Sequence, residues 1–478
     1  MVEEDKILNG VKSNYILKKI LDNIRQIKIL NIIRYNKTIQ NRLNIDINTY
    51  KNEYSKIKLE LEIFPPPKNL SLVDEVPIQN EFEENTYDFI RIKSILKSFF
   101  HIYFDNNNDN EIEVNYIKES DKVSKIKVII DSEVDSLDTL FYDCSIIKKI
   151  NFIRLARNDI KNISYLFKNC YKLKEIIFNK FNSENVINMK DMFYNCASLI
   201  ELNLSNFNTQ NVTDMSYMFY KCRNLKKLNL SNFDTRNVID MCCMFGECSN
   251  LTEINISNFD TSNVTSMSHM FDGCFALEKI NLDNFNTKNV TYMGHMFNNC
   301  RKLKKLNLSN FDTKNVTNMG YMFQGCAELT DLIISSFNTE NVGDMSSMFA
   351  LCEKLTKLNL ANFNTKNALI MENMFHGCKS LKELNVESFD TKNCINMYNM
   401  FAYCKSIKKL NLSSFETNKV NNMSYMFYKC EALEELNISN FTVKKEAMIN
   451  DMFSNCNNLK QNSKIREIKG TIFNCICI

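Results

Sequence analysis

The chain has 478 residues, of which 44% are hydrophobic and 24% charged, and its formal net charge is +3. So small a charge excludes nucleic acid as the main partner. The sequence contains no G-x-G-x-x-G, P-loop, H-E-x-x-H or nucleophile-elbow motif, which argues against the common nucleotide-binding, zinc-protease and hydrolase classes. We therefore expect a non-enzymatic protein without cofactor. We also expect no transmembrane segment, since no apolar run is long enough to cross a bilayer.

The amino-terminal region, residues 1–62, is predicted to form a small helical module. Between Asn14 and Leu43 the apolar residues recur at helical spacing, with basic residues between them. All four Pro of the chain fall between Pro65 and Pro77, so residues 63–85 are expected to form a linker.

Residues 86–144 alternate apolar and polar side chains, as in 111–116 and 125–130, and end in a degenerate first repeat at Cys144. This pattern predicts an α/β cap. Such a cap would shield the open edge of the following structure from pairing with other chains.

From residue 145 to 456 the sequence repeats itself every 26 residues without insertion or deletion. Thirteen cysteines mark the period: Cys144, Cys170, Cys196, Cys222, Cys248, Cys274, Cys300, Cys326, Cys352, Cys378, Cys404, Cys430 and Cys456. A fixed period of this length is typical of a solenoid, in which each unit buries its apolar face only by stacking on its neighbours. With parallel strands about 4.8 Å apart, about twelve units form a rod or arc about 55 Å long.

One repeat, residues 251–274, shows how each unit is built. The alternation Ile-Asn-Ile around Asn255 predicts a short strand with the Asn side chain pointing outward. From Val264 to Phe271 the apolar residues come every three positions, which predicts a 3₁₀ or α-helical turn with one face on the core. Thr261 stands just before this turn, where its hydroxyl can accept an unpaired backbone N–H.

Methionine and cysteine form columns along the predicted solenoid. Of the 23 Met, 21 lie in two columns, from Met189 to Met423 and from Met192 to Met452. A methionine stripe can bind soft metals or peptides, but regular spacing on the inner side of a turn indicates core packing. The cysteine column has an odd number of members, each with two equivalent neighbours. We therefore expect reduced, buried thiols instead of disulfides or zinc ligands.

Charged residues at the start of each strand mostly alternate in sign between neighbouring units, as at Glu201, Lys227 and Glu253. This pattern predicts ion pairs across the sheet that support the stack. Asparagines follow in a column that begins at Asn203 and Asn229, and we expect their amides to hydrogen-bond along the solenoid axis.

Two observations favour an intracellular, cytoplasmic location over the cell surface. The chain opens MVEEDKILNG, which is not a secretory signal. Sequons recur on the strands, where a spacing of about 5 Å leaves no room for a glycan on each. They lie at Asn203, Asn229, Asn255, Asn307, Asn411 and Asn437.

Sequence variation concentrates on the turn side of the units, where Tyr and His lie near Lys and Arg. Such residues are favoured in protein-binding patches. We predict a surface for a protein partner formed by Tyr217, Tyr220, His269, His295, Tyr321, Tyr425 and Tyr428. His269 and His295 lie one unit apart, but two ligands make a poor metal site, so no metal is expected.

Residues 457–478 are expected to cap the carboxyl end. The chain ends NCICI, which places Cys475 in a C-a-a-X arrangement with Lys464, Arg466 and Lys469 upstream. Prenylation of Cys475 would attach the protein to the cytosolic face of a membrane. The alternative is that the apolar residues 471–478 form the final strand of a closing repeat.

The repeats resemble those of the BspA-type leucine-rich repeat proteins, which also have 26-residue units. The matching segments read LNLSNFDTRNVIDMCCMFGEC at 228–248 and INISNFDTSNVTSMSHMFDGC at 254–274, and nearly every unit carries the same motif. The resemblance implies an α/β leucine-rich-repeat horseshoe or rod with short parallel strands and no catalytic residues. Bacterial members are often surface-exposed and take part in adhesion, and related repeats occur in protists. We expect an intracellular, protist-like member.

Residues 15–45, YILKKILDNIRQIKILNIIRYNKTIQNRLNI, loosely resemble an F-box, the helical segment by which substrate adaptors dock on a ubiquitin-ligase scaffold. The usual early Leu-Pro is missing, and the alternative is a helical cap or dimerising hairpin. The expected function is a non-enzymatic scaffold that binds protein partners through its solenoid. The alternatives are a ubiquitin-ligase substrate adaptor and a surface-exposed adhesin.

Overall fold

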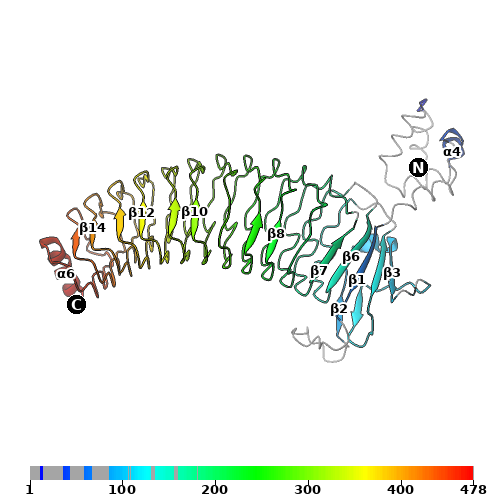
Figure 1. Cartoon of the computed structure of the whole chain (residues 1–478), viewed down its shortest axis with the longest axis horizontal. Coiled ribbons are helices and arrows are strands. Elements are labelled where there is room, and N and C mark those ends of the chain that lie inside the picture. Colours follow the sequence, from blue (N-terminus) through cyan, green and yellow to red (C-terminus); the bar gives the residue numbers. More distant parts are fainter. Residues whose placement is uncertain are drawn as a thin grey trace.

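A computed structural model shows a continuous stack of coils with a cap at each end (Figure 1). The structure describes residues 11–13, 36–43, 59–66, 85–105, 107, 109–130, 135–155, 160–179 and 181–476. Twelve parallel bridges, each between residues 26 apart, link thirteen successive positions from Ser136 to Met448. The predicted α/β repeat solenoid of about twelve 26-residue units is thereby confirmed.

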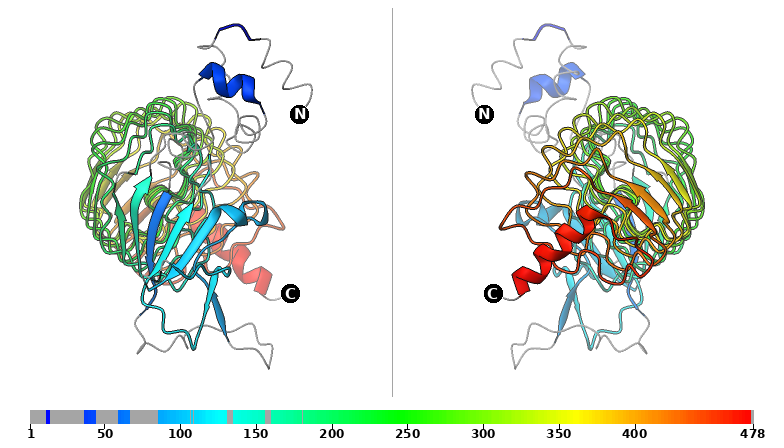
Figure 2. Two further views of the ribbon diagram at one scale, coloured as in Figure 1. Left: turned by 90° about the vertical axis from the view of Figure 1, so that its right-hand side faces the viewer. Right: turned by 90° about the vertical axis from the view of Figure 1, so that its left-hand side faces the viewer.

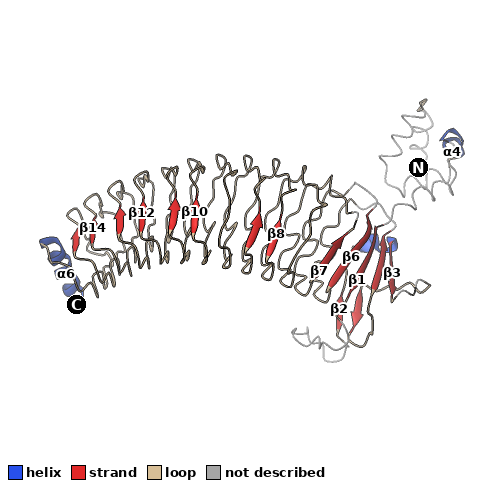
Figure 3. Ribbon diagram, viewed as in Figure 1, coloured by secondary structure: helices blue, strands red, loops and turns tan. Residues whose placement is uncertain are grey.

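Short strands line one face of the stack, and turns and loops form the rest of each coil (Figure 3). The first two strands are the longest, β6 (Lys149–Leu155) and β7 (Glu175–Phe178). The others have three residues each: β8 (Lys227–Asn229), β9 (Glu253–Asn255), β10 (Lys305–Asn307), β11 (Asp331–Ile333), β12 (Lys357–Asn359), β13 (Glu383–Asn385), β14 (Lys409–Asn411) and β15 (Glu435–Asn437). They pair two by two, in parallel and in register with the repeat.

Opposite charges open the two strands of each parallel pair. In all five pairs, from β6–β7 to β14–β15, the first strand begins with Lys and the second with Glu or Asp. Lys227 Nζ lies 2.9 Å from Glu253 Oε2, and Lys409 Nζ lies 2.9 Å from Glu435 Oε2. These contacts confirm the predicted ion pairs across the sheet, which are directly opposite in register.

The interior consists of columns of like residues. Every Met of the two columns is fully buried, which confirms their role in core packing. Beside them, a column of phenylalanines stacks without interruption from Phe141 to Phe453. All twelve neighbouring ring pairs have centroids 5.5–5.9 Å apart and planes within 14° of parallel. Such offset stacking adds to the free energy gained by burying the rings.

The coil stack is arched, and its convex side lies where the strands end (Figure 1). A second Phe column follows the strands, and its ring centroids between Phe363 and Phe441 are 6.1–6.4 Å apart. The same coils are thus wider apart on this side than at the first Phe column. Seen end-on, the coils superpose as a ring with the strands on one side (Figure 2).

The second half of each coil is a chain of tight turns, so the prediction of a 3₁₀ or α-helical turn is wrong. Tyr217 donates its N–H to Cys242 O in the next coil, and Lys221 donates to Gly246 O, both at 2.8 Å. This geometry places Tyr217 and Lys221 in the left-handed region, at φ 58° and 63°. Apolar residues every three positions are compatible with a helical turn and with a chain of tight turns. The tight turns form because they let backbone N–H groups bond to the next coil.

Polar side chains link neighbouring coils. Fully buried Thr313 donates its Oγ1 hydrogen to Asn338 O at 2.8 Å and accepts the Asn338 N–H at 2.7 Å. The predicted acceptor role of this Thr column is confirmed, but the N–H comes from the next coil. The amides of the Asn column on the strands were expected to hydrogen-bond to each other along the solenoid axis. This prediction is wrong for the Oδ1 atoms, which accept hydrogen bonds from within their own coil. Asn307 Oδ1, for example, accepts the N–H of Ser309 at 3.1 Å.

The cysteine column packs as thiols. Twelve of its members donate Sγ–H to the backbone O of a Phe 29 residues earlier, from Cys170–Phe141 to Cys456–Phe427, at 2.8–3.2 Å. Burial raises the pKa of the Cys326 thiol to about 12. The column thiols from Cys144 to Cys430 are therefore protonated and unreactive, as expected from their spacing. At the end of the column, the hydrogen bond with Cys430 lowers the pKa of the half-buried Cys456.

The amino-terminal cap extends the solenoid sheet. Strands β1 (Leu59–Phe64), β3 (Phe100–Phe104) and β5 (Ile126–Ile130) join β6 and β7 in the order β3-β5-β1-β6-β7. Because β1 pairs antiparallel with both β5 and β6, it covers the edge of the first solenoid strand. Beside this sheet lie η1 (Ser94–Phe99) and the pair β2 (Thr86–Asp88) and β4 (Tyr116–Lys118).

Strand β1 spans residues that the sequence assigned to the end of the helical module and the start of the linker. Its segment LELEIF alternates buried and half-buried side chains, which is the pattern of a sheet strand. Before it, helix α4 (Lys37–Leu43) is described. Most of the stretch that resembles an F-box lies outside the described residues.

Helix α6 (Ser463–Ile476) lies against the last coil (Figure 2). Asn462 Oδ1 accepts the Ile465 N–H at 2.8 Å at its start, and Ile465 and Ile468 are buried. Residues 471–476 are helical, so the alternative of a final strand is wrong. Within the described part of the chain, no helix is both long and apolar enough to cross a membrane.

Candidate functional site

The seven residues of the predicted partner surface lie in two neighbouring columns on the turn side, and all are half-buried. Five occupy the first left-handed position of their coils, at φ 55–60°: Tyr217, His269, His295, Tyr321 and Tyr425. Tyr220 and Tyr428 follow three residues later. The left-handed backbone costs roughly 1–2 kcal/mol for a residue with a Cβ, and the N–H bond to the next coil offsets this cost. The stack dictates the backbone here, so the side chain is free to vary.

The structure gathers these side chains into three clusters. The first consists of Tyr194, Tyr217 and Tyr220, whose ring centroids lie 5.1–6.3 Å apart. Lys168 Nζ lies 4.2 Å from the Tyr194 ring centroid, a cation–π contact. The Tyr220 hydroxyl donates to Glu247 at 3.1 Å, and burial together with this carboxylate raises the pKa of Tyr220. The Tyr220 hydroxyl and the Lys168 ammonium therefore already have partners within the chain.

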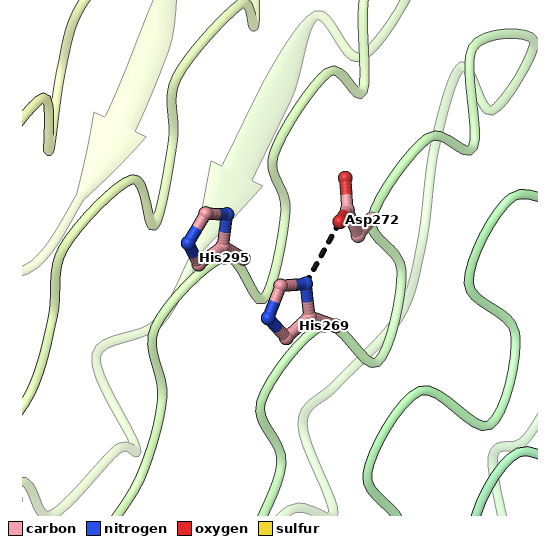
Figure 4. A group of neighbouring side chains, drawn as sticks. All are labelled: His269, Asp272 and His295. Carbon is pink, nitrogen blue, oxygen red and sulfur yellow. Dashed lines mark hydrogen bonds and ion pairs between the residues drawn. The ribbon is translucent and has the colours of Figure 1, made fainter.

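The second cluster is a stack of three rings from successive coils. His269 and His295 have centroids 4.2 Å apart with planes at 12°, and His295 and Tyr321 have centroids 4.5 Å apart with planes at 5°. Asp272, one turn after His269, accepts a hydrogen bond from His269 Nδ1 at 2.8 Å (Figure 4). The cluster thus combines two imidazoles with a carboxylate.

The third cluster forms a hollow near the carboxyl end of the stack. Tyr398, Tyr403, Tyr425 and Tyr428 line it together with His376, and its volume is about 550 Å³. The rings meet edge to face, with the Tyr403–Tyr428 and Tyr425–Tyr428 centroids 5.4 and 5.6 Å apart. This arrangement leaves the aromatic walls of the hollow uncovered by the rest of the described chain.

Basic residues adjoin the third cluster, and Lys379 is part of its lining. Lys429 Nζ lies 5.2 Å from the ring centroids of both Tyr403 and Tyr428. His376 Nδ1 is buried without a hydrogen-bond partner, and burial lowers the pKa of this imidazole. The hollow is therefore aromatic, with Lys379 in its lining, Lys429 beside two of its rings and a neutral imidazole in its wall.

A vicinal pair of thiols lies next to the first two clusters. Cys242 Sγ is 3.5 Å from Cys243 Sγ, and Cys243 occupies the left-handed position between Tyr217 and His269. The hydrogen bond from Cys243 lowers the pKa of Cys242 to about 7 and raises the pKa of Cys243. Cys242 is half-buried, so it is the reactive thiol of this pair.

The other two faces of the solenoid offer less for a ligand. The strand face has hollows of about 630 and 700 Å³, lined by its Lys, Glu and Asn ladders. A further hollow of about 860 Å³ runs beside Ile187 and Ile239, which are 47% and 50% exposed. Neither face gathers aromatic side chains as the turn side does.

Several residues of these clusters were not among the predicted site residues. Asp272, Tyr398 and Tyr403 contact the predicted ones from neighbouring columns, and Cys242 pairs with Cys243. The signal for Asp272 was the spacing H-x-x-D at 269–272 together with a second His 26 residues on. Comparison across columns, and not only along them, would have found it.

The proposed lipidation site, Cys475, lies in the last turns of α6. The basic residues upstream are on the same helix, and Lys464 Nζ contacts Glu467 Oε1 at 2.8 Å. Prenylation of Cys475 stays a prediction.

Two solved structures are similar to part of this chain. One is a leucine-rich cell surface protein from Faecalibacterium prausnitzii A2-165, with 15% identity, a TM-score of 0.33 and coverage of 66% of this chain and 84% of that one. The other is TLR13 in its complex with ssRNA13, with 18% identity, a TM-score of 0.22 and coverage of 62% and 50%. No curated protein matches the sequence.

A family of repeat-containing sequences matches most of the solenoid. Its four overlapping matches cover residues 135–252, 222–308, 299–409 and 356–467. Assignment to the BspA-type proteins in particular, and to a protist-like member of them, stays a prediction. The matches span more than half of the chain, which therefore belongs to the family DUF285, described as Mycoplasma proteins of unknown function.

Proposed function

We propose that the protein is a non-enzymatic interaction scaffold that binds a protein partner through the third cluster, the tyrosine hollow formed by Tyr398, Tyr403, Tyr425, Tyr428 and His376. The observation that carries this proposal is an aromatic hollow of about 550 Å³ built on a rigid stack. Tyrosine side chains offer a large contact area with little loss of conformational entropy, and their hydroxyls can bond to a partner's backbone.

The tyrosine hollow is favoured over the strand face for an energetic reason. Charged ladders on the strand face pair with each other, as Lys409 does with Glu435. A partner that docked there would have to desolvate these ion pairs. The rings of the hollow already pack edge to face, so their binding geometry is set before the partner arrives.

A photo-crosslinking amino acid at position 428, in the full chain within its native cells, tests the proposal. The matched rival position is Ile239, which is 50% exposed and lines the hollow on another face. We expect crosslinks to a protein at 428, lost when Tyr403 is replaced by Ser, and none at 239. Crosslinks at 239 but not at 428, or crosslinks at 428 that survive Tyr403→Ser, would contradict it.

The same experiment separates the two alternative functions. A ubiquitin-ligase adaptor requires a Skp1-like protein on residues 1–62, in addition to a substrate on the solenoid. An adhesin requires the solenoid to be accessible from outside the cell. A second crosslinking probe is therefore placed at Lys37 in α4. For an adaptor, the probes at Lys37 and Tyr428 should capture different proteins. For a scaffold, the partner captured at Tyr428 should come from inside the cell.

We propose an intracellular location for the protein. We also propose that its domains are the amino-terminal module, the cap and the solenoid. Twelve column cysteines act as hydrogen-bond donors, which requires reduced thiols. The sequon asparagines, such as Asn307, are exposed on adjacent strands and accept the N–H two residues on. Glycosylation at each of them would crowd the strand face. Fractionation of intact cells with a surface-labelling reagent checks this location.

A further inference from the structure

We propose that His269, Asp272 and His295 bind a divalent transition-metal ion of the Zn²⁺ class. One ligand atom from each residue lies within 4.8 Å of the other two, although the residues come from two coils. Two imidazole nitrogens and one carboxylate oxygen form the donor set of three-ligand zinc sites that keep a position open. The prediction from the sequence, that two histidines alone make a poor site, omitted the third ligand.

An unpaired nitrogen points to a missing ligand. Figure 4 shows Nδ1 of both histidines on the side of the rings that faces Asp272. His269 Nδ1 contacts Asp272 Oδ2 at 2.8 Å, whereas His295 Nδ1 is buried and has no hydrogen-bond partner. A buried polar atom without a partner is costly, and a metal ion between the two nitrogens and the carboxylate would supply that partner.

The carboxylate is held in place from the next coil. Asn298 Nδ2 donates to Asp272 Oδ1 at 2.9 Å, which leaves Oδ2 directed at His269. Hydrogen bonds of this kind orient first-shell ligands in metal sites. Asn298 is thus a positioning residue for the proposed site.

The surroundings of the site favour a metal ion that is intermediate between hard and soft and that keeps one coordination position open. Imidazole ligands suit Zn²⁺, Ni²⁺ and Cu²⁺, whereas Ca²⁺ and Mg²⁺ require oxygen donors. The His269 and Asp272 side chains are 37% and 22% exposed, so water or a partner's side chain can complete the coordination. The two imidazole planes are within 12° of parallel and must tilt toward each other for both nitrogens to reach one ion.

The test uses the full chain and measures binding of Zn²⁺ by equilibrium dialysis with metal analysis, and of Co²⁺ by visible absorption. The first variants are His269→Asn and His295→Asn. Asn accepts the left-handed backbone, and it naturally occupies this column at Asn373 and Asn399, both at φ 56°. These variants should therefore fold. His376→Asn is the matched control, because His376 also has a buried, unpaired Nδ1 but no carboxylate partner among the candidate ligands.

We expect one Zn²⁺ per chain for the wild type and for His376→Asn, and loss of saturable binding for His269→Asn, His295→Asn and Asp272→Asn. Removing the positioning residue, in Asn298→Ala, should weaken binding about 10–100-fold. The Co²⁺ spectrum should lack a thiolate charge-transfer band. Three results would each overturn the proposal: no saturable binding by the wild type, unchanged binding by His295→Asn, or binding that depends on Cys242 and Cys243.

Discussion

The buried threonine column offers a sharp test of how the coils hold together. Thr313 lies in the middle of the stack, and its hydroxyl makes two hydrogen bonds to the backbone of Asn338 in the next coil. Thr313→Val keeps the shape of the side chain and removes both. Each of the two bonds contributes about 1 kcal/mol, and the N–H and C=O left without partners cost about 1–3 kcal/mol more, so we expect a loss of about 3–5 kcal/mol.

Urea unfolding measures the change in the free energy of unfolding, and hydrogen exchange of the Asn338 amide reports the local effect. In a solenoid each coil contacts only its neighbours, so the destabilisation should be greatest in the coil that contains Thr313 and in the next coil, which contains Asn338. Thr313→Ser is the control, because Ser183 occupies the same column and makes both bonds, to Asn208 N at 2.8 Å and to Asn208 O at 2.9 Å.

Two outcomes would refute the reasoning. A loss below about 0.5 kcal/mol for Thr313→Val would mean that the hydroxyl contributes no more than an ordinary surface group. Equal losses for Thr313→Val and Thr313→Ser would mean that the methyl group, and not the hydroxyl, stabilises the stack.

Three further predictions concern the core, the thiols and the turns. Phe323→Ala, inside the phenylalanine stack, should cost about 3–5 kcal/mol in urea unfolding, and Phe453→Ala less, because Phe453 stacks on one ring and is 6% exposed. A haloacetamide should alkylate Cys242 ahead of the buried column cysteines, because its pKa of about 7 leaves it largely thiolate above that pH, and the rate should fall below that pH. Peptide mass spectrometry identifies the labelled residue, and faster labelling of a column cysteine between Cys144 and Cys430 would contradict the prediction. Gly377→Ala should cost about 1–2 kcal/mol, because Gly377 has φ 71° and the added Cβ would lie 2.7 Å from Leu351 Cδ2. Adding Leu351→Ala should relieve the contact but not the backbone cost, which a thermal melt of both variants checks.

The repeat period predicted the solenoid because residues 26 apart must meet in a stack. The buried Met and Phe columns and the Lys–Glu pairs across the strands followed from that period alone. The turn from Val264 to Phe271 was mispredicted because side-chain spacing does not reveal where a backbone N–H points. There Met267 and His269 donate to the next coil, to Tyr292 O and Gly294 O, both at 3.1 Å.

The site could be predicted along columns but not across them. The stacking of His269 on His295 follows directly from the period. The contact of His269 with Asp272 depends on the left-handed backbone at His269, which the apolar pattern does not encode. Strand β1 shows the same limit at the fold level, since LELEIF carries a strand pattern but pairs with residues more than 60 positions away.

The turns give the solenoid a net dipole along its axis. In each coil, alternate N–H groups point toward the carboxyl end, as those of Tyr217 and Lys221 do, and the accepting carbonyls point back. Each peptide unit carries a dipole of about 3.5 D, and aligned units add. On the turn side, the carboxyl-terminal edge is therefore a row of donors and the amino-terminal edge a row of acceptors, complementary surfaces that would let copies add head to tail into an open filament. Arg91 donates to Leu140 O and Tyr142 O at the amino-terminal edge of the turns, β1 covers the first solenoid strand, and α6 lies against the last coil, which together keep the stack finite.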